Sequence, residues 1–328
     1  MNNCQRVLIT GAGGFVGRAI VDALLHNGLQ VIALDQAFDP DLRATWQAFA
    51  GPAITLIEGD MAQLPDDSPI DAVVHGAAVT ASASELNQDP VENFRANLDP
   101  WLAVLDWAQK MAVKRVVGVS SSAVYQETAP GPILETQPTT PLGMYATAKT
   151  TMENMAQTLR TFYNRDVTMI RLSNIYGPGE RTRVSRPRVS LIGGMISEAV
   201  QTQQLSVSAD TPARDWTLAP DIGQAVAALL AAPHLSHPLY HVAAEQVVTP
   251  LQIAEEIKKH LPDVTLKITG QSPQPAGNKR LGYLSNARLH EDVGFDGWTD
   301  LATGLGQSID WFKQATHRSS LLIDGENA

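Results

Sequence analysis

The sequence has few of the features that mark secreted, membrane or nucleic-acid-binding proteins. Its 328 residues include one cysteine, Cys4, so an intrachain disulfide and a cysteine-based zinc site are both excluded. Only 24 lysines and arginines stand against 34 aspartates and glutamates, which gives a net charge of -10. Such a chain is a poor general binder of DNA or RNA, because neutralising phosphates needs clustered basic side chains. We expect no nucleic-acid partner, no metal and a cytoplasmic protein.

Long apolar segments are also missing. The longest, near residues 225–232, is much shorter than the roughly 20 residues that a membrane-spanning helix needs. The first residues lack the basic and apolar regions of a targeting signal, so we expect no membrane partner. Apolar residues at 44% and charged residues at 18% are typical of a globular enzyme. The length suits one large domain or two coupled ones.

The first half of the chain alternates between short apolar runs and helical segments. Six runs are typical of strands, at residues 6–10, 30–34, 53–57, 72–75, 115–119 and 167–171. Three longer segments are typical of helices, at about 14–26, 89–111 and 141–163. Apolar strands separated by helices imply a parallel sheet covered on both faces. Right-handed crossovers then give an α/β fold with a doubly wound, Rossmann-type sheet.

The pattern changes after about residue 172. Proline and arginine become dense, and later helices are expected at about 189–203, 221–232, 250–260 and 301–314. We therefore expect a Rossmann domain over residues 1–172. A smaller, substrate-binding lobe over residues 173–315 would be partly interleaved with it, and residues 316–328 would form a tail.

A glycine-rich turn, TGAGGFVG at residues 10–17, joins the first predicted strand to the first helix. Gly11 would permit the tight turn, and Gly17 would let helix and strand pack closely. Gly14 would let the backbone approach a pyrophosphate at the helix N-terminus, where unpaired N–H groups favour anions. In this context the pattern indicates a dinucleotide site.

Two aspartates follow the next strands. Asp35 ends the second strand, where a carboxylate accepts hydrogen bonds from both ribose hydroxyls and repels a 2'-phosphate. This favours NAD over NADP. Asp60 follows the third strand and could contact the adenine edge, although an ordinary turn aspartate is an equally simple interpretation.

Tyr145 and Lys149 stand four residues apart, so on a helix they share one face. A lysine beside a tyrosine stabilises the phenolate, and we expect it to lower the phenol pKa. Such a tyrosine exchanges a proton with an alcohol or a carbonyl while hydride moves at the same carbon. Ser120-Ser121-Ser122 ends the fifth strand, at the sheet edge where ligands bind. A hydroxyl there can hold the substrate oxygen.

Together these elements resemble the extended short-chain dehydrogenase/reductase family, which contains NAD-dependent sugar and nucleotide-sugar epimerases, dehydratases and related dehydrogenases. The resemblance extends to about Phe312. It rests on eight ordered motifs: TGAGGFVG (10–17), GDM (59–61), HGAAVT (75–80), SSSAVY (120–125), YATAK (145–149), RLSNIYGPGE (171–180), ARDWTLAPDIGQAV (213–226) and GLGQSIDWF (304–312).

The resemblance implies a role for each matching residue. Tyr145 would be the acid/base, Lys149 its electrostatic partner and Ser121 the catalytic hydroxyl. Contacts to NAD are implied for Gly11, Gly14, Phe15, Val16, Gly17, Asp35, Asp60, Met61, Ala77, Ala78, Asn97 and Lys149. Substrate contacts are expected for Ser122, Asn174, Arg183, Arg186, Arg214 and Arg280. His75 matches a family position that is not catalytic, and we interpret it as structural.

The residues after Ser121 bear on the reaction. The family's 4,6-dehydratases carry an Asp-Glu pair there and its decarboxylases a glutamate, whereas this chain has Ser122 and Ala123. Elimination therefore lacks its general acid, and reversible oxidation of a secondary alcohol remains. Reduction of the ketone on its other face would make an epimerase, and release of the oxidised product a dehydrogenase. An NAD-sensing binding protein is disfavoured by the complete Ser121, Tyr145 and Lys149 set.

The substrate clues point two ways. Arg214-Asp215 resembles the pair whose arginine binds pyrophosphate in nucleotide-sugar members, but Tyr283 stands where those members have an acidic residue. Residues 180–188 carry four arginines, which suit phosphate or carboxylate groups, although a solvated loop is the plainer alternative. We favour a sugar or nucleotide-sugar epimerase over an NAD-dependent dehydrogenase of an anionic sugar, sugar acid or polyol.

By family resemblance we also expect a homodimer that forms through residues 89–111 and 141–163. Trp101, Leu105 and Ala108 form a stripe on the first of these helices. The stripe could face a partner subunit, or more simply the core.

Overall fold

The computed structural model of the protein describes residues 4–66, 69–125, 131–270 and 282–325. Within these ranges, none of the helices combines the length and the apolar character needed to cross a membrane.

Seven parallel strands form the central sheet in the order β11-β7-β5-β4-β1-β2-β3. The strands are β1 (Arg6–Thr10), β2 (Gln30–Asp35), β3 (Ile54–Glu58), β4 (Ala72–His75), β5 (Arg115–Ser121), β7 (Val167–Leu172) and β11 (Leu239–Val242). The chain builds outward from β1 to β3, then crosses to β4 and builds in the other direction. The doubly wound, Rossmann-type sheet is therefore confirmed, and its switch point lies between β1 and β4.

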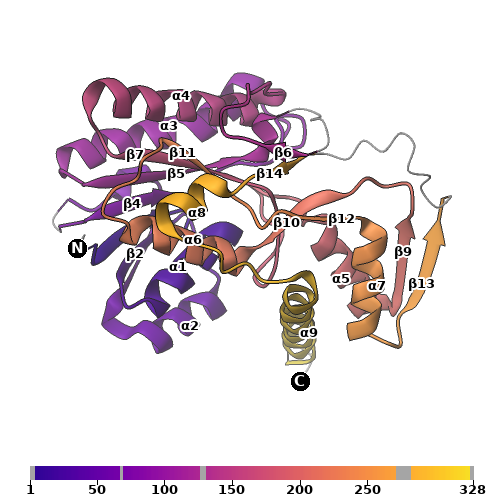
Figure 1. The fold of residues 1–328 in the computed structure, drawn as a ribbon. Helices are drawn as coiled ribbons and strands as arrows, with labels where there is room; N and C mark the ends of the chain where they lie inside the picture. Colours follow the sequence, from indigo (N-terminus) through magenta and orange to yellow (C-terminus); the bar gives the residue numbers. More distant parts are fainter. Residues whose placement is uncertain (1–3, 67–68, 126–130, 271–281, 326–328) are drawn as a thin grey trace.

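Helices cover both faces of this sheet (Figure 1). One face carries α1 (Phe15–His26), α2 (Pro40–Ala50), α6 (Ala219–Ala231) and α8 (Ala287–Val293), and the other carries α3 (Pro90–Lys110) and α4 (Gly143–Tyr163). Successive side chains of β1 alternate between the two layers, because a strand has a period of two residues. Val7 and Ile9 join the cluster under α1 and α6, and Leu8 joins the cluster under α3 and α4.

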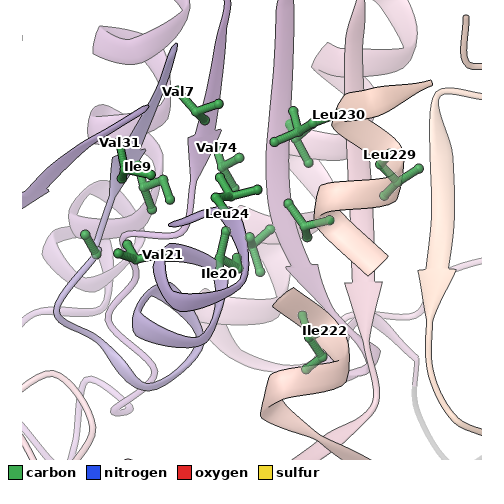
Figure 2. Close-up of a cluster of buried hydrophobic side chains, with 14 of the residues drawn as sticks. Val7, Ile9, Ile20, Val21, Leu24, Val31, Val74, Ile222, Leu229 and Leu230 are labelled. Atoms are coloured by element: carbon green, nitrogen blue, oxygen red, sulfur yellow. The ribbon is translucent and has the colours of Figure 1, made fainter. Parts of the chain in front are cut away.

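Figure 2 shows the first of these clusters. Val7, Ile9, Val31 and Val74 from the strands meet Ile20, Val21 and Leu24 of α1 and Ile222, Leu229 and Leu230 of α6. Both α6 and β11 follow residue 172 in sequence. The second half of the chain thus returns to complete the sheet domain.

The rest of the second half forms a lobe with its own core, seen at the right of Figure 1. Its main elements are α5 (Leu191–Thr202), β9 (Gln204–Ser208), α7 (Pro250–His260), β13 (Thr265–Thr269) and α9 (Leu301–Gly325). Two small sheets lie between the lobe and the main sheet. They contain β8 (Asn174–Tyr176), β10 (Arg214–Leu218) and β12 (Gln246–Val248), and β6 (Pro132–Ile133) with β14 (Tyr283–Leu284).

Two helices differ from the prediction, and the position of a third decides between two alternatives. Helix α9 continues to Gly325, so helix extends into the segment expected to be a tail. Helix α2 was not predicted, although Asp39 caps it and Pro40 opens it. The stripe on α3 faces the core, since Trp101, Leu105 and Ala108 are all buried among sheet residues.

Candidate active site

A cleft of about 1000 Å³ opens at the carboxyl ends of the central strands. It is lined from both halves of the chain. The sheet domain contributes the glycine turn, the ends of β2 and β5, and the start of α4, and the second half contributes Gly179 and residues 181–186. Twelve of the expected site residues line it together: Gly11, Gly14, Phe15, Val16, Gly17, Asp35, Ala78, Ser121, Tyr145, Lys149, Arg183 and Arg186.

The glycine turn has no room for side chains. Gly11 has φ +70°, and a Cβ there would lie 2.6 Å from the backbone nitrogen of Ala77. A Cβ on Gly17 would lie 1.9 Å from the carbonyl oxygen of Gly11. Gly14 is the N-cap of α1 and has no capping side chain, so the first N–H groups of the helix remain available to a ligand. This cradle fits a dinucleotide pyrophosphate.

Asp35 lies beside this turn at the end of β2. Its Oδ2 accepts a hydrogen bond from the Gly13 backbone N–H at 2.9 Å. Its Oδ1 lies 3.7 Å from Nη1 of Arg183. The carboxylate is thereby fixed at the rim of the cradle, in the position expected of a ribose acceptor.

The three expected catalytic residues meet at the end of β5. Ser121 is the last residue of that strand, and its Oγ accepts a hydrogen bond from the Ala123 N–H at 3.1 Å. The phenol of Tyr145 is hydrogen-bonded to Ser121. Nζ of Lys149 donates to the carbonyl oxygen of Val119 at 2.8 Å and lies 5.7 Å from the centre of the Tyr145 ring.

A family model described as the NAD dependent epimerase/dehydratase family matches residues 7–243. The chain belongs to this family. A UDP-glucose 4-epimerase of Mycolicibacterium smegmatis is 24% identical over 321 residues, which cover 94% of this chain and 99% of that protein. UDP-glucuronic acid decarboxylase 1 of Arabidopsis thaliana is 24% identical over 315 residues, which cover 94% of this chain and 70% of that protein.

Solved structures show the same fold. A UDP-glucose 4-epimerase of Bifidobacterium longum, in complex with NAD+ and UDP, has a TM-score of 0.79 at 20% identity and covers 94% of this chain and 98% of that one. A UDP-glucuronic acid 4-epimerase of Bacillus cereus has a TM-score of 0.78 at 20% identity, and the match covers 95% of this chain and 100% of that one. The resemblance to extended short-chain dehydrogenases is confirmed, and the chain is an NAD-dependent enzyme of that family.

Burial shifts the pKa values of Tyr145 and Lys149, the expected acid/base and its partner. Burial raises the pKa of Tyr145 and outweighs the hydrogen bond from Ser121 and the charge of Arg186, which both lower it. The expectation that Lys149 lowers this pKa is wrong, because removal of the phenol from water dominates. Burial also lowers the pKa of Lys149 to about 8, and the carboxylate of Glu153 opposes that shift.

This pKa predicts a pH-dependent stability. Unfolded Lys149 regains its ordinary pKa of 10.5, so between pH 8 and that value the unfolded chain binds more protons than the folded one. The free energy of unfolding should then rise with pH, by up to about 1.4 kcal/mol per unit. We expect this rise in the difference between the wild type and Lys149→Met, measured by urea denaturation at each pH. A difference that stays flat would mean that burial leaves the lysine pKa unchanged.

A buried ion pair that the sequence interpretation missed lies behind Lys149. Arg171 of β7 donates to Glu153 of α4 through two nitrogens, Nε to Oε1 at 2.8 Å and Nη2 to Oε2 at 2.6 Å. Oγ of Ser120 donates to the same Oε1 at 2.5 Å, and Arg171 also donates to the hydroxyl of Tyr125. The sequence could have indicated Glu153 by its spacing, because it follows Lys149 by four residues and so lies on the same helix face.

Several expected cofactor residues lie outside the cleft lining. Asp60 accepts a hydrogen bond from the Ala62 N–H at 2.7 Å and caps the short helix η2 (Met61–Gln63). Asn97 is buried, and its amide bonds both backbone groups of Val79, at 2.9 Å and 3.1 Å. Asp60 and Asn97 therefore hold the loops next to the cleft. The backbone of Ala77 lies against Gly11 of the glycine turn.

Only some of the expected substrate residues line the cleft. Nδ2 of Asn174 donates to the carbonyl oxygen of Asp215 at 2.9 Å, and Arg214 on β10 is exposed. Ser122 begins the short helix η3 (Ser122–Val124) next to Ser121. Arg280 lies outside the described residues. Of the arginine run, Arg183 lies at the glycine turn and Arg186 at the tyrosine end of the cleft.

His75 is completely buried behind the site. Its Nδ1 shares a hydrogen bond with Oγ1 of Thr10 at 2.8 Å. Burial and the charge of Lys149 lower its pKa to about 3, so the ring is neutral. Across the described parts of the chain, no three histidine, cysteine or acidic side chains gather into a group that could hold a metal ion.

Proposed function

We propose that the protein is an NAD-dependent epimerase that inverts a secondary alcohol of a sugar nucleotide. The observation that carries this proposal is the composition of the cleft around Tyr145. Its described lining there offers hydroxyl groups and cations, from Ser120, Ser121, Lys149 and Arg186. The acids that line the cleft lie on the side of the glycine turn, since Asp35 ends β2 and Asp39 follows it. This lining supports hydride chemistry, and among the residues that the structure describes no carboxylic acid lines the cleft near Tyr145 to assist the elimination of water.

The described residues divide the work of a reversible oxidation. The cofactor, when bound, supplies the hydride acceptor and donor. The Ser121 hydroxyl holds the substrate oxygen, and the phenolate form of Tyr145 takes its proton as the ketone forms. Lys149, fixed on the Val119 carbonyl, places its charge 5.7 Å from the centre of the Tyr145 ring, where it stabilises the phenolate that burial disfavours. The ketone rotates in the cleft and presents its other face, hydride returns to its carbon from that face, and Tyr145 returns the proton to its oxygen, which completes the inversion.

We further propose that the substrate carries an anionic group that pairs with Arg186. Glu180 is buried and accepts a hydrogen bond from Nη2 of this arginine. The guanidinium also packs on the Phe15 ring, 4.7 Å from its centre. Its Nη1 is buried and has no hydrogen-bond partner among the described residues. A guanidinium fork that is held on one nitrogen, unpaired on the other and lines the same cleft as Tyr145 suits a pyrophosphate or carboxylate.

Substitution of this arginine should weaken substrate binding. In Arg186→Ala we expect the KM to rise by about tenfold to a hundredfold, with a smaller change in kcat, because a charge-assisted contact is lost. Arg188→Ala is the matched control in the same segment, since its side chain is 81% exposed and pairs with Glu85 at the surface. Equal KM values for Arg186→Ala and the wild type would overturn the anion assignment.

A second candidate is an NAD-dependent dehydrogenase of an anionic sugar, sugar acid or polyol. Arg214, the residue that resembles a pyrophosphate ligand, is exposed and does not line the cleft, which favours a smaller substrate. One incubation separates the candidates. Purified protein, NAD and a pool of aldoses, uronates, sugar phosphates and UDP- and dTDP-sugars are followed by absorbance at the NADH band and by NMR. A new stereoisomer without net NADH supports the epimerase, and accumulating NADH supports the dehydrogenase.

The setting of the enzyme is also proposed. A homodimer through α3 and α4 is supported by apolar side chains that both helices expose: Val91, Leu102, Met144, Phe162 and Tyr163. Sedimentation velocity at micromolar concentration tests it, and a single monomer boundary would count against it. A cytoplasmic location is consistent with a chain whose single cysteine, Cys4, rules out an intrachain disulfide.

A further inference from the structure

A segment of the second lobe, residues 181–186, crosses onto the cofactor half of the cleft. Arg183 and Arg186 exchange backbone hydrogen bonds of 2.8 Å and 2.9 Å, which close a tight turn over residues 184–185. At its tip the Ser185 carbonyl accepts hydrogen bonds from the N–H groups of Thr80 at 2.9 Å and Ala81 at 3.2 Å. The turn is therefore docked on the loop that follows β4, above the switch point of the sheet.

The arginines of this turn reach the glycine cradle. Nη2 of Arg183 donates to the carbonyl oxygen of Gly13 at 2.5 Å, and Nη1 lies 3.7 Å from Asp35. Next to it Arg181 pairs with Asp39, the N-cap of α2. From the sequence we expected Arg183 to contact the substrate. Its contacts instead join the two groups that cradle a dinucleotide, the pyrophosphate turn and the ribose carboxylate.

We infer that Arg183 is a cofactor-binding residue supplied by the second lobe, which closes the adenosine-ribose end of the cleft over the bound dinucleotide. A guanidinium at this point can pair with a pyrophosphate oxygen or a ribose hydroxyl without leaving Gly13. Two of its contacts, on Gly13 and Asp35, already orient it before the cofactor arrives. Preorganised donors of this kind cost little to order on binding.

This clamp deepens the proposed function, because an epimerase must keep its reduced cofactor until the ketone is reduced again. The same turn carries Arg186, which we place on the substrate. Retention of the cofactor and recognition of the substrate would then share one turn. The inference about Arg183 requires only that the chain binds NAD, so it can be tested by binding alone, without knowledge of the sugar.

The test measures the release of NADH. NADH bound to the purified full-length protein is chased with excess NAD in a stopped-flow instrument, and the fluorescence decay gives the dissociation rate. We expect Arg183→Ala to release NADH about ten times faster than the wild type. Arg188→Ala, which removes the same charge from an exposed position, should stay within about twofold. Because the contact is ionic, added salt should speed release from the wild type more than from Arg183→Ala.

Two results would overturn the inference. Unchanged release from Arg183→Ala would mean that the guanidinium serves only the turn and Asp35. Slower release would mean that it competes with the cofactor for the cradle. The Arg183 side chain is 34% exposed, so the variant should fold, and thermal melting of the cofactor-free protein checks this. Arg183→Lys, which keeps the charge without the fork, should release NADH at an intermediate rate. Failure of the epimerase proposal would appear in the sugar products and leave these rates unaffected.

Discussion

Tyr145→Phe should lower kcat by about three orders of magnitude while NADH binds as tightly as in the wild type. Positioned proton transfer contributes roughly 10²–10⁴ to an enzymatic rate, and the phenol is the group that meets Ser121 at the end of the cleft. Loss of one hydroxyl leaves the ring packing intact. The expected defect is therefore chemical, and it should appear equally in single-turnover measurements with excess enzyme.

A matched control lies on the same helix. Tyr163 ends α4, and it is 67% exposed. Tyr163→Phe should leave kcat within about twofold of the wild type. If Tyr145→Phe kept more than about a tenth of the activity, another group would have to move the proton. Weaker NADH binding in Tyr145→Phe with normal kcat would assign the phenol to the cofactor.

Local sequence predicts the local geometry of the candidate site. The glycine turn and the spacing from Tyr145 to Lys149 depend on contacts within one strand, turn or helix. The end of β5 was placed by the apolar run before Ser121, so that residue could be positioned without knowledge of the rest of the fold. In each case residue type and spacing determine the geometry.

The parts that depend on tertiary contacts were not predictable. Arg183 and Gly13 are 170 positions apart, so no local pattern shows that they touch. The return of α6 and β11 to the sheet also joins distant segments. Asn97 is bound to Val79, which the sequence could not distinguish from a cofactor contact. The phenol pKa was predicted in the wrong direction because burial, which sets it, arises only from packing.

The largest effect on stability is expected from the buried pair behind the site. Glu153→Gln should lower the free energy of unfolding by about 3–5 kcal/mol, because it leaves the Arg171 guanidinium without a counter-charge. Both side chains are nearly inaccessible, at 7% and 4% exposure, so water cannot replace the lost partner. Urea denaturation followed by tryptophan fluorescence measures the change. Asp106→Asn, which breaks an exposed pair with Lys110, should have little effect.

A double variant separates the cost of an unpaired charge from the value of the pair itself. Glu153→Gln with Arg171→Met removes both charges, and it should be more stable than Glu153→Gln alone, since buried pairs often add little net stability. If Glu153→Gln were as stable as the wild type, the pair would carry no such cost.

In the folded single variant the pKa of Lys149 should fall below its value of about 8, since Glu153 opposes the lowering. Because the proposed step uses the charge of Lys149, we expect activity to fall at a lower pH in this variant than in the wild type. The pair would thus hold Lys149 protonated as well as hold β7 to α4.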